Sequence, residues 1–166
     1  ENSALPHARA SQRKLKRGDT VLIDIGVRVD NYHSDMCRTV FFKDAHPEMK
    51  KIYEIVKIAQ QKALEKVRAG EKTTALDQIA RAYIVEKGYG PNFAHSLGHG
   101  VGLEIHEYPT LRSKGPEVIL KQDMAITIEP GIYLPGLGGV RIEDMVIVEE
   151  NGYEDLTNRE KELIVV

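Results

Sequence analysis

The sequence predicts a single α+β domain, because strand-forming segments open the chain, two amphipathic helical segments follow, and strand-forming segments then return. Its 166 residues are 42% hydrophobic, which is enough to bury one substantial core but leaves too little chain for two ordinary domains. Neither a short repeat nor a low-complexity linker divides the sequence. We therefore treat residues 1–166 as one domain.

The first predicted element is a β-hairpin. Residues 20–29 are mostly apolar and residues 32–42 are rich in strand formers. The dipeptide between them, Asp30-Asn31, consists of residue types that tolerate the positive φ of a tight hairpin turn. The pattern favours a two-residue turn at this dipeptide.

This turn fixes which residues face each other across the hairpin. It places Asp24 opposite Cys37 and Asp35 opposite Gly26, so the two aspartates become diagonal neighbours on one face. Two carboxylates about 7–8 Å apart on an apolar hairpin repel each other and lose solvation, unless a cation lies between them. The hairpin alone also allows a simpler interpretation, with one aspartate at a strand end and the other facing water.

Two helices are predicted after the hairpin. The first begins near Pro47, which suits a first helical turn, and is expected to end at Gly70. The second starts at a sequence that resembles a capping box, Thr74 followed by Asp77, and continues to Gly88. Their apolar stripes are Ile52, Ile55, Val56, Ala59, Ala63, Leu64 and Val67 in the first helix, and Leu76, Ile79, Ala80, Tyr83 and Ile84 in the second.

The second half of the chain is predicted to be largely sheet. A glycine-rich stretch covers residues 88–102, and residues 124–129 and 140–148 have the composition of buried strands. Pro130-Gly131 and the glycines of residues 136–139 connect these two strands.

Three polar residues of this half stand in settings that are unusual for solvated side chains. Glu129 ends one apolar run, and Glu143 lies inside the other. His99 lies between two glycines, which predicts a bend with close backbone approach and makes it the natural nitrogen ligand. Each glutamate alone is more often a strand-boundary residue. A phosphate loop at His99 is disfavoured, because the Lys-Ser/Thr of such a loop is missing.

Five segments together carry a family resemblance. The sequence is similar to the pita-bread metallopeptidases, and most similar to their Xaa-Pro dipeptidases and Xaa-Pro aminopeptidases, through LIDIG, SDMCRT, HSLGHGVGLEIHEYP, ITIEPGIY and GVRIED. The resemblance implies the α+β pita-bread fold, with a curved antiparallel sheet, helices on its outer face and two pseudo-symmetric halves. The first half looks incomplete at its amino-terminal end, so we expect the chain to be a fragment of a longer one.

The resemblance also implies a metal centre. The family's five ligands to two divalent ions match Asp24, Asp35, His99, Glu129 and Glu143. Asp35 and Glu143 would bridge the ions, Asp24 would hold one, and His99 with Glu129 would hold the other. Four carboxylates and one imidazole suit Mn(II) or Co(II), our expected cofactors, better than a thiolate-rich zinc site does. Two such ions about 3.5–4 Å apart can acidify a water that attacks a peptide carbonyl, and Glu129 would shuttle its proton.

Further residues are assigned to the substrate pocket on the same basis. The family's pocket histidines, which assist catalysis and bind substrate, match His7, His95 and His106. Without the resemblance each of these would be taken as a structural histidine, and His33 and His46 keep that interpretation.

Arg141 lies two residues before Glu143 and is expected to face the same side of a strand, where it could clamp a substrate carboxylate or an acidic ligand. An arginine at this position is typical of the proline-directed enzymes of the family. Cys37 is a departure, because the family usually has threonine there and a thiol is the weaker hydrogen-bond donor.

The expected function is therefore hydrolysis of the bond between an amino-terminal residue and proline, with dipeptidase and aminopeptidase action both open. The alternatives are a methionine aminopeptidase, a creatinase-like hydrolase or a non-catalytic peptide-binding module. A formal net charge of -2 argues against a nucleic-acid partner. A single cysteine and the lack of a long apolar run indicate a cytoplasmic protein without a membrane span. We expect a homodimer.

Overall fold

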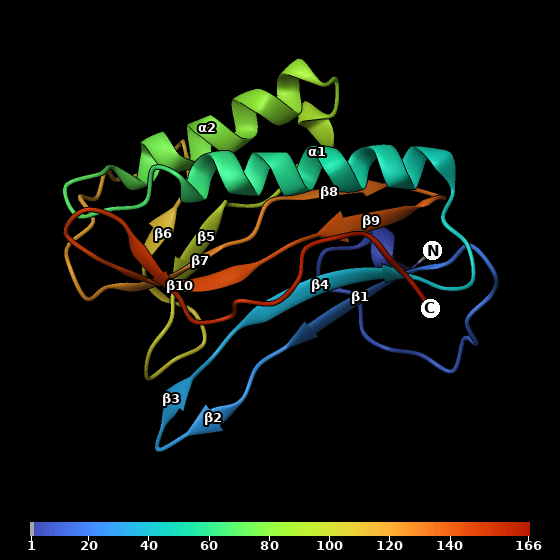
Figure 1. The fold of residues 1–166 in the computed structure, drawn as a ribbon, viewed down its shortest axis with the longest axis horizontal. Helices are drawn as coiled ribbons and strands as arrows, with labels where there is room; N and C mark the ends of the chain where they lie inside the picture. The colour runs from blue at the N-terminus through green and yellow to red at the C-terminus, as the bar shows by residue number, and fades with distance from the viewer. Residues whose placement is uncertain (1) are drawn as a thin grey trace.

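The computed structural model describes residues 2–166, with two helices stacked on one side of the strands (Figure 1). The strands form a three-stranded sheet in the order β1-β4-β12, a five-stranded sheet in the order β11-β10-β7-β5-β6, and the two-stranded pairs β2-β3 and β8-β9. The helices are α1 (Pro47–Leu64) and α2 (Thr73–Glu86), with 3-10 turns η1 (Asn2–Ala4) and η2 (Gly90–Asn92). The strands are β1 (Thr20–Ile25), β2 (Arg28–Val29), β3 (Tyr32–His33), β4 (Met36–Phe41), β5 (Gly98–Gly100), β6 (Glu107–Leu111), β7 (Ala125–Ile128), β8 (Gly131–Leu134), β9 (Gly138–Arg141), β10 (Asp144–Val148), β11 (Tyr153–Asp155) and β12 (Ile164–Val165).

The first hairpin has the predicted turn and register. Asp30 and Asn31 have φ values of 48° and 71°, the left-handed conformation that both central residues of a type I′ turn require. Asp24 faces Cys37 across β1 and β4, as expected. The pairs on both sides of Asp35 and Gly26 keep the predicted register, but the ladder is interrupted between β1 and β2 and between β3 and β4, so these two residues form no ladder pair. Asp35 lies in this interruption, so the direction of its side chain is not set by the alternation of side chains along β4.

Helix α1 is shorter than its apolar pattern predicts. It begins as expected at Pro47, where a ring nitrogen of His46 accepts a hydrogen bond from the Glu48 amide at 3.2 Å. It ends at Leu64 rather than at Gly70, because the next amides bond three residues back instead of four and tighten the backbone. Val67 is nevertheless buried, so the apolar stripe continues beyond the helix that it predicted.

The predicted capping box of α2 is wrong. The helix starts at Thr73, and no side chain caps its first turn. The Asp77 carboxylate is fully buried and instead accepts hydrogen bonds from the Arg81 guanidinium, one turn later, and from the Leu97 amide. The Asp77 carboxylate is thus already occupied by Arg81 and Leu97 and does not cap the helix. Gly88 has a φ of 88° just beyond the helix and ends it as predicted.

The predicted strand over residues 140–148 is two strands that pair with different neighbours. β9 pairs with β8 in a hairpin that the sequence did not predict, whereas β10 pairs with β7 and β11 in the five-stranded sheet. The chain changes partners at Ile142-Glu143, where the Glu143 amide donates to the Cys37 carbonyl at 3.0 Å. This isolated bridge joins β4 to the second half of the chain and thereby brings the two sheets together.

The core lies between α1 and the strands. Its largest fully buried side chains include Tyr53 and Ile52 from α1, Phe41 from β4, and Ile126 and Ile128 from β7. Burying a side chain of this size contributes about 1.5–3 kcal/mol. Within residues 2–166, neither helix has the length and apolar character that crossing a bilayer requires.

Candidate metal centre

The five residues expected to be metal ligands come from both sheets and converge. Asp24 lies on β1 and Asp35 in the interruption before β4. His99 lies on β5, Glu129 directly follows β7, and Glu143 stands between β9 and β10. Glu143 also forms the bridge to Cys37 that joins the two sheets, and this junction is the seam of the site.

The ligand atoms form overlapping groups of three. Asp24, Asp35 and Glu143 make one group, and His99, Glu129 and Glu143 make a second; within each group the ligand atoms lie within 4.8 Å of one another. Glu143 belongs to both groups. Asp35 also belongs to a further group with His99 and His106 that meets the same limit. Two adjacent cation positions that share carboxylates fit this arrangement.

The expected bend at His99 is in fact the buried strand β5. Gly98 and Gly100 flank it, and a Cβ on either glycine would collide with a backbone carbonyl of a neighbouring strand, that of Thr127 or that of Tyr108. The sequence prediction of close backbone approach is thus confirmed, although the local structure differs. Only glycine lets the two strands beside β5 come close enough to enclose its histidine.

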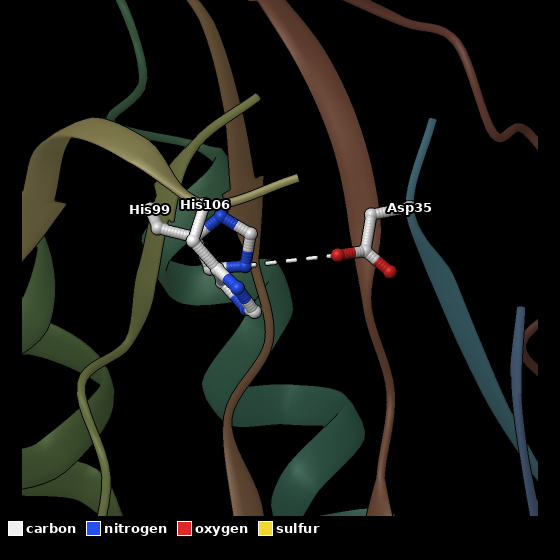
Figure 2. Close-up of side chains that lie close together, drawn as sticks. All are labelled: Asp35, His99 and His106. Carbon is white, nitrogen blue, oxygen red and sulfur yellow. Dashed lines mark ion pairs between the residues drawn. The ribbon is translucent and has the colours of Figure 1, made fainter. Parts of the chain in front are cut away.

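The imidazole of His99 is oriented by its own backbone. Nδ1 lies 3.0 Å from the Gly100 carbonyl oxygen, to which it donates, so Nε2 is the nitrogen that faces the neighbouring carboxylates. Nε2 lies 3.2 Å from Oε1 of Glu129 and 3.7 Å from Oδ2 of Asp35. Figure 2 shows this ring beside His106, with Asp35 facing it from another segment. An imidazole with a fixed Nδ1–H and two nearby carboxylates has the form of a metal ligand.

Crowding of the carboxylates shifts their pKa values. Burial, together with the charge of Asp24, raises the pKa of Asp35 from 3.8 to about 6. Burial, with the charges of Glu129 and Asp35, raises the pKa of Glu143 well above its usual value. Ionising both groups together is unfavourable, and a nearby positive charge would offset this cost. The donor set therefore fits divalent cations held among these side chains.

Glu129 is the carboxylate favoured in its ionised form. Burial opposes its ionisation, but the hydrogen bond with His99 and the positive charges of His95, His99 and Arg141 outweigh burial and lower its pKa. For His99, burial is likewise outweighed by the Glu129 carboxylate and the Gly100 carbonyl, and its pKa is raised. The two side chains share a proton in this arrangement, and a cation can replace it.

Arg141 reaches the site and is held there by three partners. Its guanidinium pairs with the Asp24 carboxylate and donates to the Pro6 carbonyl at 2.9 Å and to the Tyr133 hydroxyl at 3.0 Å. The side chain is 4% exposed. Arg141 therefore contacts another predicted ligand, Asp24. It also borders a cavity next to the site.

The predicted pocket histidines line a cavity of about 490 Å³ beside the ligands. His95 uses both ring nitrogens, because Nδ1 donates to the Ser96 carbonyl at 2.8 Å and Nε2 accepts from the Tyr133 hydroxyl at 3.0 Å. His106 lies edge-on to His99, with ring centroids 4.3 Å apart. His7 reaches the same cavity from the amino-terminal segment and is exposed. The cavity opens next to Glu129 and Arg141, where a small molecule would meet the site.

The sequence reasoning missed Tyr133, although its hydroxyl joins His95 to Arg141. The signal was a tyrosine in an otherwise apolar strand, since a buried tyrosine hydroxyl usually has a hydrogen-bond partner. Burial raises the pKa of this hydroxyl well above its usual range, so it remains protonated and donates.

Comparison with known proteins places the chain in one family. The model of metallopeptidase family M24 matches residues 1–150. Among curated proteins, an Xaa-Pro dipeptidase of Pyrococcus furiosus is 52% identical over 162 residues, which are 98% of this chain and 46% of that protein. The chain thus spans about half the length of the curated relatives it matches.

Solved structures agree along nearly the whole chain. The prolidase of Pyrococcus horikoshii superposes with a TM-score of 0.95 at 51% identity, over 98% of this chain and 46% of that one. The X-Pro aminopeptidase of Thermotoga maritima gives a TM-score of 0.95 at 44% identity, over 99% and 46%. This agreement in sequence and backbone confirms the pita-bread fold, and the chain belongs to metallopeptidase family M24.

Proposed function

We propose that this chain carries the dinuclear metal centre of a peptidase that cleaves the bond between an amino-terminal residue and proline. The observation that carries the proposal is the sharing of Glu143 by two three-residue groups of ligand atoms. The Xaa-Pro dipeptidase and X-Pro aminopeptidase named among the similar proteins support the proline-directed substrate class.

In this proposal Mn(II) or Co(II) ions occupy the site, because oxygen donors dominate it. Asp35 and Glu143 would contribute to both positions, Asp24 would hold the ion at one, and His99 with Glu129 would hold the ion at the other. The membership of the three groups supports this division, since Glu143 and Asp35 are the carboxylates that occur in more than one group. When bound, the ions supply Lewis-acid polarisation of the scissile carbonyl and make a water more acidic.

The side chains around the ions then move protons and orient the peptide. Glu129 has a lowered pKa, so its carboxylate is ionised at neutral pH and can accept a proton from the attacking water and return it to the leaving proline nitrogen. The pKa of His106 is lowered by burial and by the neighbouring His99, so its neutral ring can donate a hydrogen bond to the carbonyl oxygen.

The remaining pocket residues divide between orientation and binding. His95 has both nitrogens engaged and acts by holding the Tyr133 hydroxyl, which in turn accepts a hydrogen bond from Arg141. His7, on the exposed amino-terminal segment, contacts the peptide across the cavity. Arg141 contributes a fixed positive charge that attracts a carboxylate of a short peptide or pairs with Asp24.

The test is hydrolysis of matched peptides by the purified protein. Chelator-treated protein should lack activity, and Mn(II) or Co(II) should restore cleavage of Ala-Pro but not of Ala-Ala. Including Ala-Pro-Ala distinguishes aminopeptidase from dipeptidase action. Equal turnover with and without metal, or equal cleavage of Ala-Pro and Ala-Ala, would overturn the proposal.

A further inference from the structure

The guanidinium of Arg38 lies behind the candidate metal centre and holds the backbone at Glu143. Its Nη1 donates to the Glu143 carbonyl oxygen at 2.5 Å and to the Cys37 carbonyl oxygen at 3.0 Å. These two residues form the bridge that joins β4 to the β9–β10 connection. Arg38 therefore binds the backbone on both sides of the bridge, and one of these two residues, Glu143, is shared by the two groups of ligand atoms.

The other nitrogen of the same guanidinium binds the carboxylate that follows Glu143 and a segment near the end of the chain. Nη2 donates to Oδ1 of Asp144 at 2.6 Å. It also lies 3.1 Å from each of the carbonyl oxygens of Thr157 and Arg159. Because a guanidinium is planar and rigid, contacts on both nitrogens fix its orientation as well as its position.

Asp144 is fully buried and surrounded by donors from separate elements. Its Oδ2 accepts from Nε2 of Gln60 in α1 at 3.0 Å and pairs with the Lys161 ammonium. The same amide nitrogen of Gln60 also lies 3.1 Å from the carbonyl oxygen of Ile128, the residue before Glu129. The network thus contacts the backbone next to two of the expected ligands, without touching the ligands' own carboxylates.

A buried ion pair is by itself weak evidence for stability, because its desolvation cost offsets much of its attraction. If the network served only to hold the last segment of the chain in place, Arg38 would need no hydrogen bond to the Glu143 carbonyl. The contacts at Glu143 and Ile128 instead join the network to the placement of the ligands.

We propose that Arg38 and Asp144 are positioning residues that set the spacing between the two cation positions by fixing the backbone at Glu143. The inference rests on the dinuclear centre of the proposed function. It assigns a role to the arginine of the SDMCRT segment and to the last residue of GVRIED, which the ligand set leaves without one. Loss of the network should weaken the binding of one ion and disturb the coupling between two, while the ligands themselves remain.

The first variant to test is Arg38→Lys, which keeps the charge but cannot make paired contacts with the Glu143 carbonyl and Asp144 at once. Mn(II) binding is measured by isothermal titration and the coupling of the ions by electron paramagnetic resonance. Co(II) absorption reports the ligand geometry. We expect affinity for one of the two ions to fall about 10- to 100-fold, as with other residues that support ligands, and the signal of a coupled pair to give way to that of isolated Mn(II).

The matched control is Lys57→Gln. Lys57 on α1 pairs with Glu162 at 2.7 Å and so anchors the same terminal segment, but it pairs with Glu162 and Glu54 rather than with the backbone at Glu143. Asp144→Asn serves as a second test of the network, since it weakens the pairing with Arg38 and keeps a similar shape. Melting temperatures are measured for every variant with chelator and with Mn(II).

The readings separate positioning from simple stabilisation. A positioning role requires that Arg38→Lys and Asp144→Asn reduce the Mn(II)-induced rise in melting temperature, while Lys57→Gln leaves this rise unchanged. Two tightly bound, coupled ions in folded Arg38→Lys or Asp144→Asn would overturn the inference. Peptide hydrolysis by the unmodified protein is scored separately, so unchanged metal binding in these variants leaves the proposed function intact.

Discussion

The Nε2 atom of His99 lies 3.2 Å from Oε1 of Glu129, across the adjacent strands β5 and β7. The pKa of the imidazole is raised and that of the carboxylate lowered, so the contact favours a proton on the imidazole. A divalent ion bound at these two atoms must displace it. Metal binding and proton release are therefore coupled at this pair.

We predict that metal affinity falls as the pH is lowered from 8 to 5. Below their raised pKa values, Asp35 at about 6 and His99 hold protons that compete with the ion, and lowering the pH increases this competition. Titration with Mn(II) in buffers of different ionisation enthalpy measures the protons released. An affinity that stays constant over this range, with no protons released, would contradict the assigned ligands.

We predict that Asp35→Asn and Glu143→Gln abolish high-affinity binding of at least one ion, whereas His7→Ala and His106→Ala retain both ions but lose turnover. The shared carboxylates neutralise both cations, while the histidines line the cavity. Metal content after dialysis and Ala-Pro hydrolysis are measured together. Asp44→Asn, at an exposed pair with Arg17, is the control that should alter neither. Histidine variants that lost metal but kept activity would reverse the division of roles.

We predict that Gly98→Ala destabilises the protein by about 3 kcal/mol or more and impairs metal binding, because its methyl group would collide with the Thr127 carbonyl and push β5 away from β7. Gly152→Ala is the matched control, since an added Cβ there meets no atom within 4 Å. Urea unfolding of both variants tests the difference. Equal stability of the two would show that β5 tolerates a side chain.

We predict that Arg81→Met destabilises the protein by about 3–5 kcal/mol, because it leaves the buried Asp77 carboxylate without its cation. The segment carrying His95 should also loosen, since Arg81 donates to the Phe93 carbonyl at 2.8 Å and to the His95 carbonyl at 2.7 Å. Lys87→Met removes the exposed pair with Glu86 and should change stability by less than about 0.5 kcal/mol. Chemical unfolding measures both effects, and KM for Ala-Pro reports the loosened pocket.

We predict that the purified chain self-associates through the hairpin that projects from the sheets (Figure 1). Ile25, Val27 and Val29 alternate along it and are 54%, 65% and 65% exposed, which leaves an apolar face open to a partner. Sedimentation should show masses above 18.6 kDa that rise with concentration. Val27→Thr combined with Val29→Thr should lower them, and Val85→Thr on α2 should not. A constant mass of one chain would exclude this surface as the interface.

The parts of the fold that depend on local signals could be predicted from the sequence. Asp30-Asn31 set a turn whose conformation fixes the register, so the pairing of Asp24 with Cys37 followed directly. The hairpin of β8 and β9 escaped prediction, because its many glycines obscure the alternation that marks a strand. Asp77 illustrates the general limit: its residue type suited a local cap, but distant partners in the folded chain determine its contacts.

The candidate site shows the same division. Residue order and the family resemblance supplied the five expected ligands, and the structure brings their atoms into overlapping groups. Arg38 and Asp144 could not be assigned, because their contacts join segments far apart in the chain, and no periodicity encodes such contacts. A role for Tyr133 could have been predicted, since a tyrosine hydroxyl in a buried strand requires a hydrogen-bond partner.

The bridge between Cys37 and Glu143 also has a consequence for how the protein matures. Asp24 and Asp35 are synthesised well before Glu143. A nascent chain that has formed only its first hairpin offers two carboxylates and no complete site. Binding of both ions therefore requires that the β9–β10 connection has already packed against β4.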